Sequence, residues 1–452
     1  MLKARLVLIS LVCLITCIVS LLSCKRELDS LNDGSPISVV PPIVGVPIIS
    51  DKSILNGYLD KQSYFPADSA CLFVSSTVEF KNGSIGVYNA LGTIVAYIKA
   101  GKMYHQEPLG DKPYENGFEY SDPIKFSIPE LKSGVYLIAN KIPFIIKSKV
   151  ATDITIVYPS NTENAYCTSG RRSLYTTPVS KKVSFLRPIP YSTSSAGFLK
   201  WMLKQSYSYN VISDIDLEEY NELKGKLIII CGHNEYWTRK ARRNFDKFVD
   251  QGNSALILSG NTMWWQITYN KEMNQVICYK YQGEPTTPDS LKTINWPDKR
   301  LKYETITSIG CDFNRGGYGN NGKEGWRGFK VNSPNSPLFA GLGVKRGDII
   351  NCPTAEYDGA PLKGFDKYGY PILDEKELGF EKVELLGFDL GFRVTKTVGT
   401  ATLFMKKTNS GTIVNFPSTD WCTVSNFGNP QIPQITKNAI DGLLAKRNLF
   451  SN

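Results

Sequence analysis

The sequence predicts an antiparallel β domain followed by a larger α/β domain. Between residues 50 and 150, short apolar segments alternate with Gly, Pro and Asn at regular intervals, a pattern typical of an antiparallel β-sandwich. Between residues 151 and 452, strand patterns alternate with helical patterns, which is typical of an α/β fold with a mostly parallel sheet. The clearest unit lies in this second region, where apolar runs at 227–231 and 255–258 flank a helical segment.

The composition indicates a globular chain and argues against two classes of function. Hydrophobic residues make up 42% and charged residues 21% of the 452 positions, enough for two or three domains with cores. The net charge is +10, but Lys and Arg are scattered and no basic run alternates with aromatic residues, so we expect no nucleic-acid partner. Only 2 histidines are present, which argues against a histidine-rich zinc site.

The N-terminus has the form of a bacterial lipoprotein signal. Lys3 and Arg5 precede an apolar run at 6–22, and the run closes with Ser23 and Cys24. We expect residues 1–23 to be removed and Cys24 to be acylated, which would anchor the chain in the lipid bilayer of the cell envelope, facing the periplasm or the exterior. An ordinary signal peptide or a single membrane anchor is the alternative. Residues 24–49 are Pro-rich and are expected to form a tether.

The expected elements of the two domains follow from short-range patterns. In the first domain (50–150) we expect strands at 71–77, 84–90, 93–99 and 134–137, and an exposed His105 without a functional partner. In the second domain (151–452) we expect strands at 153–159, 209–213 and 411–421, and helices at 198–205 and 434–445. The long segment 271–355 is rich in Asn, Gly and Tyr, and we expect it to form loops at the ligand-binding edge of the sheet.

Polar side chains follow both strands of the central unit. His233 and Glu235 come after the strand at 227–231, and Asn261 comes after the strand at 255–258. Thr238 is expected to cap the intervening helix and Gly252 to end it. Because parallel strands joined by a helix have their carboxyl ends at one edge, the three polar side chains are expected to converge there.

Two tyrosines follow the strand at 153–159. If the exit of that strand lies at the same edge, Tyr166 and Tyr175 face His233 and Glu235. Phenolate and carboxylate oxygens are hard anionic ligands that suit Fe(III). On residue chemistry alone, however, tyrosines beside a cleft more often pack and form hydrogen bonds.

Four motifs taken together resemble the family of the large (β) subunit of N,N-dimethylformamidase. They are NTxxAY at 161–166, SLY at 173–175, GHNEYW at 232–237 and GNTxxWQ at 260–266. The resemblance covers most of 150–450, and the preceding β domain is also similar to that family's N-terminal domain. It implies a glutamine-amidotransferase-like (flavodoxin-like) α/β domain that holds a mononuclear ferric ion and hydrolyses C–N amide-type bonds of a small substrate.

The resemblance also implies roles for single residues. Tyr166, Tyr175 and Glu235 would hold the iron. His233 would orient a water or stabilise the oxyanion, with Asn261 donating to the same oxygen. A general base best matches Glu356, with Glu381 and Asp389 as rivals. The sequence departs from the family at Asn234, where Asp is commoner, which removes one charge beside the metal.

Other readings stay open at this point. A non-catalytic cell-surface lipoprotein that binds a carbohydrate or another small ligand would use the same fold. A cysteine-nucleophile amidotransferase fits poorly, because Cys231 ends an apolar strand without the sharp turn that such a nucleophile needs. Trp237, Trp264 and Trp265 suit either a dry pocket wall or the core. A homo-oligomer and a complex with a small subunit are both open.

Overall fold

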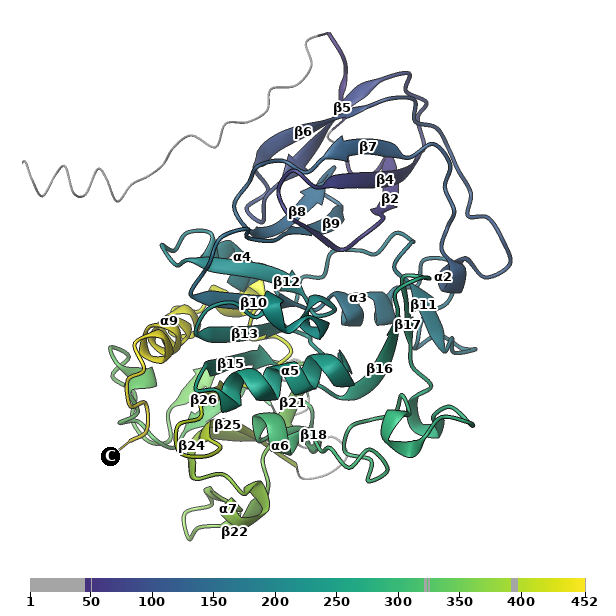
Figure 1. Cartoon of the computed structure of the whole chain (residues 1–452). Helices are drawn as coiled ribbons and strands as arrows, with labels where there is room; N and C mark the ends of the chain where they lie inside the picture. Colours follow the sequence, from purple (N-terminus) through teal and green to yellow (C-terminus); the bar gives the residue numbers. More distant parts are fainter. Residues whose placement is uncertain (1–44, 50, 321–322, 324–325, 392–396, 452) are drawn as a thin grey trace, which may run out of the picture. The chain divides into compact units, whose positions relative to one another are not determined.

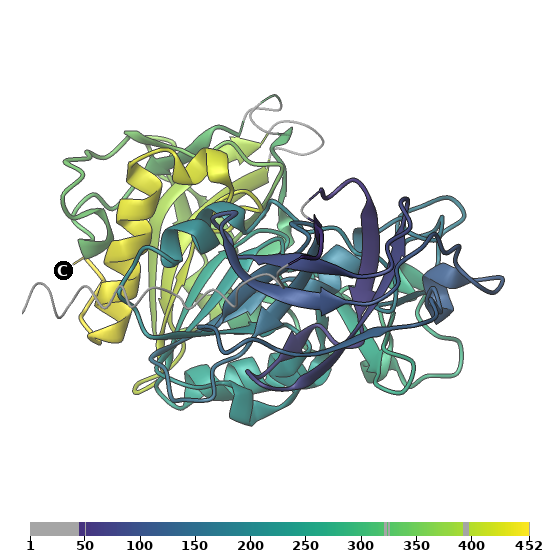
Figure 2. The same cartoon turned by 90° about the horizontal axis from the view of Figure 1, so that it is seen from above.

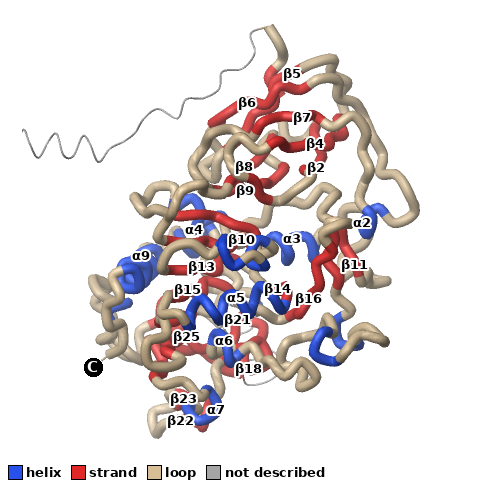
Figure 3. The backbone as a smooth tube through the Cα atoms, viewed as in Figure 1, coloured by secondary structure: helices blue, strands red, loops and turns tan. Residues whose placement is uncertain are grey.

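A computed structural model describes residues 45–49, 51–320, 323, 326–391 and 397–451. The predicted signal peptide, Cys24 and the first part of the tether lie outside these residues. Among the described residues, no helix is both long and apolar enough to cross a membrane. The protein is a mixed α/β structure with many strands in several sheets and few helices (Figure 3). The division of the chain at residue 150 stays a prediction.

The N-terminal part contains two sheets that share one apolar core (Figure 1). The larger consists of β1 (Ile48–Ile49), β3 (Ser63–Tyr64), β5 (Gly83–Tyr88), β6 (Ile94–Ala100), β8 (Gly134–Ile138) and β9 (Ile142–Ile146). The smaller consists of β2 (Leu55–Leu59), β4 (Ser69–Ser76) and β7 (Ile124–Ser127). Alternate side chains at the start of β4 are buried, as expected for a strand with one face on a core. The four predicted strands of this region are confirmed within a few residues.

The main sheet has nine strands and is mixed. In spatial order they are β12 (Tyr209–Ser213), β10 (Ile154–Tyr158), β13 (Leu227–Gly232), β15 (Ser254–Ser259), β26 (Thr412–Asn415), β25 (Thr397–Met405), β24 (Lys382–Gly391), β19 (Gly328–Val331) and β20 (Ile349–Asn351). The first five are parallel to their neighbours, and all later pairings are antiparallel. The prediction of a mostly parallel sheet is therefore wrong. The chain between β24 and β25 is too short for the helical crossover that a parallel pair requires.

Helices cover both faces of the main sheet (Figure 2). On one face lie α4 (Ala196–Met202) and α9 (Gln431–Leu444), and their apolar side chains belong to one core cluster. On the other face lies α5 (Arg239–Asp250), which contributes to a second cluster. The predicted cap is confirmed, because Thr238 Oγ1 accepts a hydrogen bond from Ala241 N at 3.2 Å. Gly252 follows α5 with φ +89°, as a C′ glycine does.

Smaller elements surround the carboxyl edge of the parallel strands. They include α3 (Ser160–Tyr166), β11 (Lys182–Ser184), β14 (Tyr236–Thr238), β16 (Trp265–Asn270), β17 (Gln275–Ile277), β18 (Asp312–Tyr318) and β21 (Glu356–Gly359). Other short elements of the described chain include α2 (Pro113–Asn116), α6 (Ile306–Ile309), α7 (Glu375–Leu378), α8 (Val424–Phe427), β22 (Leu362–Phe365) and β23 (Pro371–Leu373). Segment 271–355 is therefore not simply loops, since β19 and β20 extend the main sheet.

Candidate active site

The candidate site lies where three neighbouring parallel strands end. Strands β10, β13 and β15 pair in register. Tyr166 is the last residue of α3, which follows β10, while His233 and Glu235 follow β13 and Asn261 follows β15. Glu356, at the start of β21, joins them from a separate sheet. The structure therefore brings His233, Glu235 and Asn261 together, as predicted.

Glu235 is the centre of the site, with a side chain only 2% exposed. The Tyr175 hydroxyl donates to Glu235, with 2.8 Å to Oε1 and 3.0 Å to Oε2. Trp265 Nε1 donates to Oε1 at 2.8 Å, and the backbone N–H of Glu235 donates to Thr162 Oγ1 at 2.9 Å. Burial raises the pKa of Glu235, although the neighbouring His233 partly offsets that effect. The carboxylate is thus held by the Tyr175 hydroxyl and by the indole N–H of Trp265.

The two tyrosines form a stacked pair beside this carboxylate. The ring centroids of Tyr166 and Tyr175 are 4.1 Å apart, and the Tyr236 hydroxyl donates to the Tyr175 hydroxyl at 2.7 Å. About two fifths of each residue is exposed, at 40% and 42%, but the Tyr175 hydroxyl reaches the buried Glu235 carboxylate. Burial, and then the negative charge of Glu235, raise the pKa of both phenols. As long as no metal ion is bound, both phenols are therefore neutral at neutral pH.

His233 lies between two carboxylates. Its Nε2 is 3.5 Å from Glu235 Oε2 and 3.4 Å from Glu356 Oε2, and this buried nitrogen has no hydrogen-bond partner among the described residues. Asn261 Nδ2 donates to Glu356 Oε2 at 3.0 Å, while the Asn261 Oδ1 is also buried and unpartnered in this part of the chain. Unpartnered buried polar atoms are rare in proteins and often mark a functional site.

The rivals of Glu356 have other partners. Glu381 accepts a hydrogen bond from the Thr408 hydroxyl, and Asp389 accepts one from the backbone N–H of Arg327. Neither contact involves a residue of the candidate site. The structure therefore brings Glu356, and not its rivals, to His233 and Asn261.

Asp358 holds the backbone of the Asn261 turn and was missed by sequence reasoning. Its Oδ1 accepts from Asn261 N at 2.9 Å and its Oδ2 from Thr262 N at 3.2 Å. Asn261 has φ +50°, and a Cβ on Gly260 would lie 2.6 Å from Glu356 O, so the turn is tightly packed. The two-residue spacing in β21 puts Asp358 on the same face as Glu356, and that spacing was the available signal.

Arg187 holds the segment that carries both tyrosines, and it was also missed. Its side chain is fully buried and donates to four backbone carbonyls, those of Asn164 (2.8 Å), Ser169 (2.7 Å), Arg172 (2.9 Å) and Ser184 (3.0 Å). One of these carbonyls lies in α3, and two lie in the chain between α3 and Tyr175. A buried guanidinium therefore fixes the course of the chain from one tyrosine to the other.

The three tryptophans belong to the core. Trp237 is 1%, Trp264 7% and Trp265 3% exposed, and all three lie in buried apolar clusters. Trp237 Nε1 also donates to Asn234 Oδ1 at 2.8 Å, which gives Asn234 a structural partner. The Trp265 side chain donates to the Glu235 carboxylate, and the backbone N–H of Trp264 donates to the Glu235 carbonyl oxygen at 2.8 Å.

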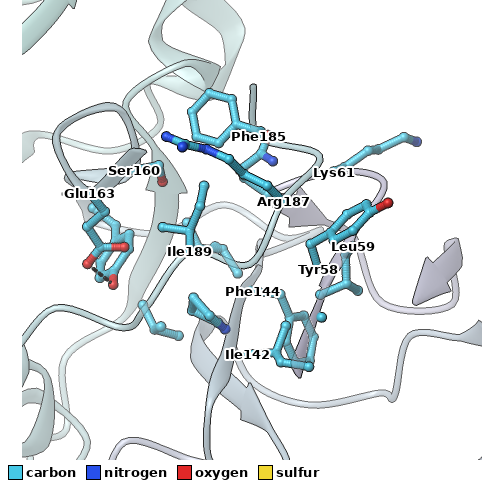
Figure 4. Close-up of a pocket in the computed structure, with 16 residues that line it drawn as sticks. Tyr58, Leu59, Lys61, Ile142, Phe144, Ser160, Glu163, Phe185, Arg187 and Ile189 are labelled. Atoms are coloured by element: carbon cyan, nitrogen blue, oxygen red, sulfur yellow. Dashed lines mark hydrogen bonds between the residues drawn. The ribbon is translucent and has the colours of Figure 1, made fainter. Parts of the chain in front are cut away.

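A cleft of about 430 Å³ opens beside Tyr166 and His233. Its walls come from α3 and from residues 190–194, and they include Glu163 and Tyr191. Behind Glu163 lies a smaller cavity of about 50 Å³ (Figure 4). In that view Glu163 and Ser160 lie on one side of the small cavity, and Tyr58 and Lys61 lie on the other. Glu163 therefore lines both hollows.

The donor set suits a ferric ion. Among the described residues, no group of three or more His, Cys, Asp or Glu could hold a metal. The expected set is of another kind, because it contains one carboxylate, Glu235, and two phenols. Two phenol oxygens and a carboxylate are hard ligands, and a cation among them would reverse the upward pKa shift of Tyr166 and Tyr175. The side chains present therefore fit Fe(III).

Comparison with known proteins agrees with the motifs. A search of curated proteins found no match. The family model described as N,N-dimethylformamidase beta subunit-like, C-terminal, matches residues 119–426, which is more than half of the chain. The matched region contains every residue of the candidate site. The chain therefore belongs to the N,N-dimethylformamidase beta subunit-like family.

Proposed function

We propose that this protein hydrolyses a C–N amide-type bond of a small substrate with the help of a ferric ion held by Tyr166, Tyr175 and Glu235. The observation that carries the proposal is the position of the unpartnered His233 Nε2 between the carboxylates of Glu235 and Glu356. Family membership supports the hydrolase class. We also propose that the N-terminal part is a β-sandwich and that the part after it is an amidotransferase-like domain.

The side chains divide the work of amide hydrolysis among them. When bound, a ferric ion would supply Lewis-acid polarisation of the amide carbonyl and a lowered pKa for water. Glu356, held by Asn261 at 3.0 Å, accepts a proton from the attacking water. His233, in the tautomer with its proton on Nε2, donates to the carbonyl oxygen as negative charge develops there. The water oxygen bonds to the acyl carbon, and the C–N bond breaks with its electron pair on nitrogen. Glu356 delivers the proton to that nitrogen, and the second water proton stays on the acid, so the products are a carboxylic acid and an amine.

Iron content and the visible spectrum of the full-length chain test this proposal. We expect about one iron per chain and a tyrosinate-to-iron absorption band. Tyr166→Phe and Tyr175→Phe should each remove the band and most of the iron. The matched control is Tyr207→Phe, because the Tyr207 hydroxyl donates to Asp441 and has no contact with the site. Full iron and full amide hydrolysis in Tyr166→Phe would exclude the ligand assignment.

We also propose that Cys24 carries a lipid and anchors the chain in the cell envelope. The proposal rests on the charged start, the apolar run and the cysteine of the first 24 residues. Mass spectrometry of the N-terminal peptide should find a diacylglyceryl group on Cys24, and Cys24→Ala should shift the protein from the detergent phase to the aqueous phase. An unmodified N-terminus that starts at Met1 would exclude the proposal.

A further inference from the structure

We propose that the amine half of the substrate is a single sugar ring, so that the enzyme cleaves the amide of an N-acyl amino sugar. This inference rests on the proposed amide hydrolysis and assigns the cleft beside Tyr166 and His233 to the leaving group. The cleft measures about 430 Å³, which is within the usual range for small-molecule sites and much more than a dialkylformamide needs.

The walls of the cleft are rich in hydroxyl groups. Thr168 and Thr193 are exposed at its rim, and Ser192 and Ser194 lie further in. The described residues that line it include no Lys or Arg. Such a wall offers many neutral donors and acceptors and no positive charge.

Tyr191 adds a hydroxyl group that forms no hydrogen bond within the described part of the chain. Its Oη is buried without a hydrogen-bond partner, and its ring lies parallel to that of Tyr158 with centroids 6.3 Å apart. Tyr191 is among the residues that line the cleft, so a small turn of its side chain would bring this hydroxyl to a bound ligand. A buried phenol without a partner is unfavourable, so the position calls for a ligand group that donates to it or accepts from it.

Glu163 adds a fixed carboxyl group. Its Oε1 accepts from the Tyr158 hydroxyl and from Ser192 N, the latter at 3.0 Å. Both contacts use the same oxygen, and Glu163 lines the cleft, so we expect Oε2 to be the atom that meets a ligand there. Figure 4 shows this carboxyl group beside the smaller cavity, with its hydrogen bond drawn.

These features together favour a neutral, polyhydroxylated ring. Sugar hydroxyls both donate and accept, so they match Glu163, Tyr191 and the Ser and Thr hydroxyls at once. The partly exposed ring of Tyr166 and the flat Pro190 suit the C–H face of a sugar. An alkyl amine would leave the buried polar groups unpaired, and a phosphorylated amine would lack a cationic partner.

The reaction balances without any further reagent. The water oxygen bonds to the acyl carbon, and the bond from that carbon to the sugar nitrogen breaks. The nitrogen keeps the electron pair and takes the proton, so the products are a carboxylic acid and the free amino sugar.

Amine release from matched substrates tests the inference on the full-length, iron-loaded protein. We would compare methyl N-acetyl-glucosaminide with N-cyclohexylacetamide, which has the same amide and a ring without hydroxyls, and with dimethylformamide. We expect kcat/KM to be at least about tenfold higher for the sugar, since a site built to bind hydroxyls rejects analogues that lack them. Equal or lower kcat/KM for the sugar would overturn the inference.

Two variants separate the sugar contacts from the chemistry. Tyr191→Phe removes only the unpartnered hydroxyl. It should lower kcat/KM about fivefold or more for the sugar amide, and by a clearly smaller factor for the cyclohexyl amide. Thr193→Val, at the exposed rim, is the second variant if Tyr191→Phe does not fold, and Tyr207→Phe is the control. An equal loss on both substrates would overturn the assignment of the cleft.

Binding separates this inference from the proposed function. Saturation-transfer NMR with the same methyl glycoside, on the Tyr166→Phe variant, reports binding without turnover. If the glycoside binds but the native protein hydrolyses no amide, the sugar site is supported and the proposed hydrolase function is excluded. Hydrolysis of simple amides without any binding of the glycoside would remove the sugar site alone.

Discussion

Replacement of Asp358 should disable the candidate site without touching any proposed iron ligand. The fully buried Asp358 carboxyl accepts from two backbone N–H groups, at 2.9 Å from Asn261 and 3.2 Å from Thr262. Asn261, with φ +50°, in turn donates to Glu356 at 3.0 Å. Loss of the Asp358 carboxyl should therefore allow the turn at Asn261 to move, and Glu356 should then lose its hydrogen bond from Asn261.

The size of the effect follows from the number of groups left unpaired. A buried N–H without a partner costs about 1–3 kcal/mol. Asp358→Ala leaves two such groups, so we expect the free energy of unfolding to fall by about 2–6 kcal/mol. Asp358→Asn keeps one acceptor and places a donor against the other N–H, so we expect a loss of about 1–3 kcal/mol.

Denaturant unfolding, iron content and amide hydrolysis would be measured on the same preparations of Asp358→Asn. We expect kcat to fall at least about tenfold with iron content kept, because a misplaced catalytic group lowers the rate strongly. Asp289→Asn is the control, since Asp289 is 62% exposed and pairs only with Lys292 in the described chain. Native stability together with native kcat in Asp358→Asn would refute the argument that this carboxyl positions Asn261.

Three further predictions concern the support of the site and the core. Arg187→Lys should lower the free energy of unfolding by about 3 kcal/mol and reduce the iron content, because one ammonium group cannot reach all four carbonyl oxygens. Arg346→Lys, on the exposed surface, is the control. Unchanged iron content in Arg187→Lys would contradict the prediction. Burial raises the pKa of Glu163 from 4.5 to about 8, so between about pH 5 and 8 the folded state binds more protons than the unfolded state, and stability should fall as the pH rises. Glu163→Gln should flatten this fall in denaturant titrations at a series of pH values. An unaltered pH profile in this variant would count against the prediction. Phe245→Ala removes a fully buried ring from α5 and should cost about 3–5 kcal/mol in chemical unfolding, whereas a loss below about 1 kcal/mol would mean that the cluster repacks.

Local patterns in the sequence determined the elements nearest the site. Strands β10, β13 and β15 are short apolar runs, and α5 has a periodic apolar face with Thr238 at its start and Gly252 after its end. Since parallel strands end at one edge, these local patterns already put His233, Glu235 and Asn261 together. The roles of these residues, and of the tyrosines, stay predictions that the iron and activity measurements test.

Contacts between distant residues were decided only by the tertiary structure. Asp358 and Asn261 are 97 positions apart, and Tyr175 and Glu235 are 60 apart. Neither pair leaves a periodic signal, because hydrophobic periodicity reports only which face of an element is buried and not what packs against it. For the same reason the antiparallel half of the main sheet and the role of Arg187 were missed, since their partners are brought together by the fold of the whole chain.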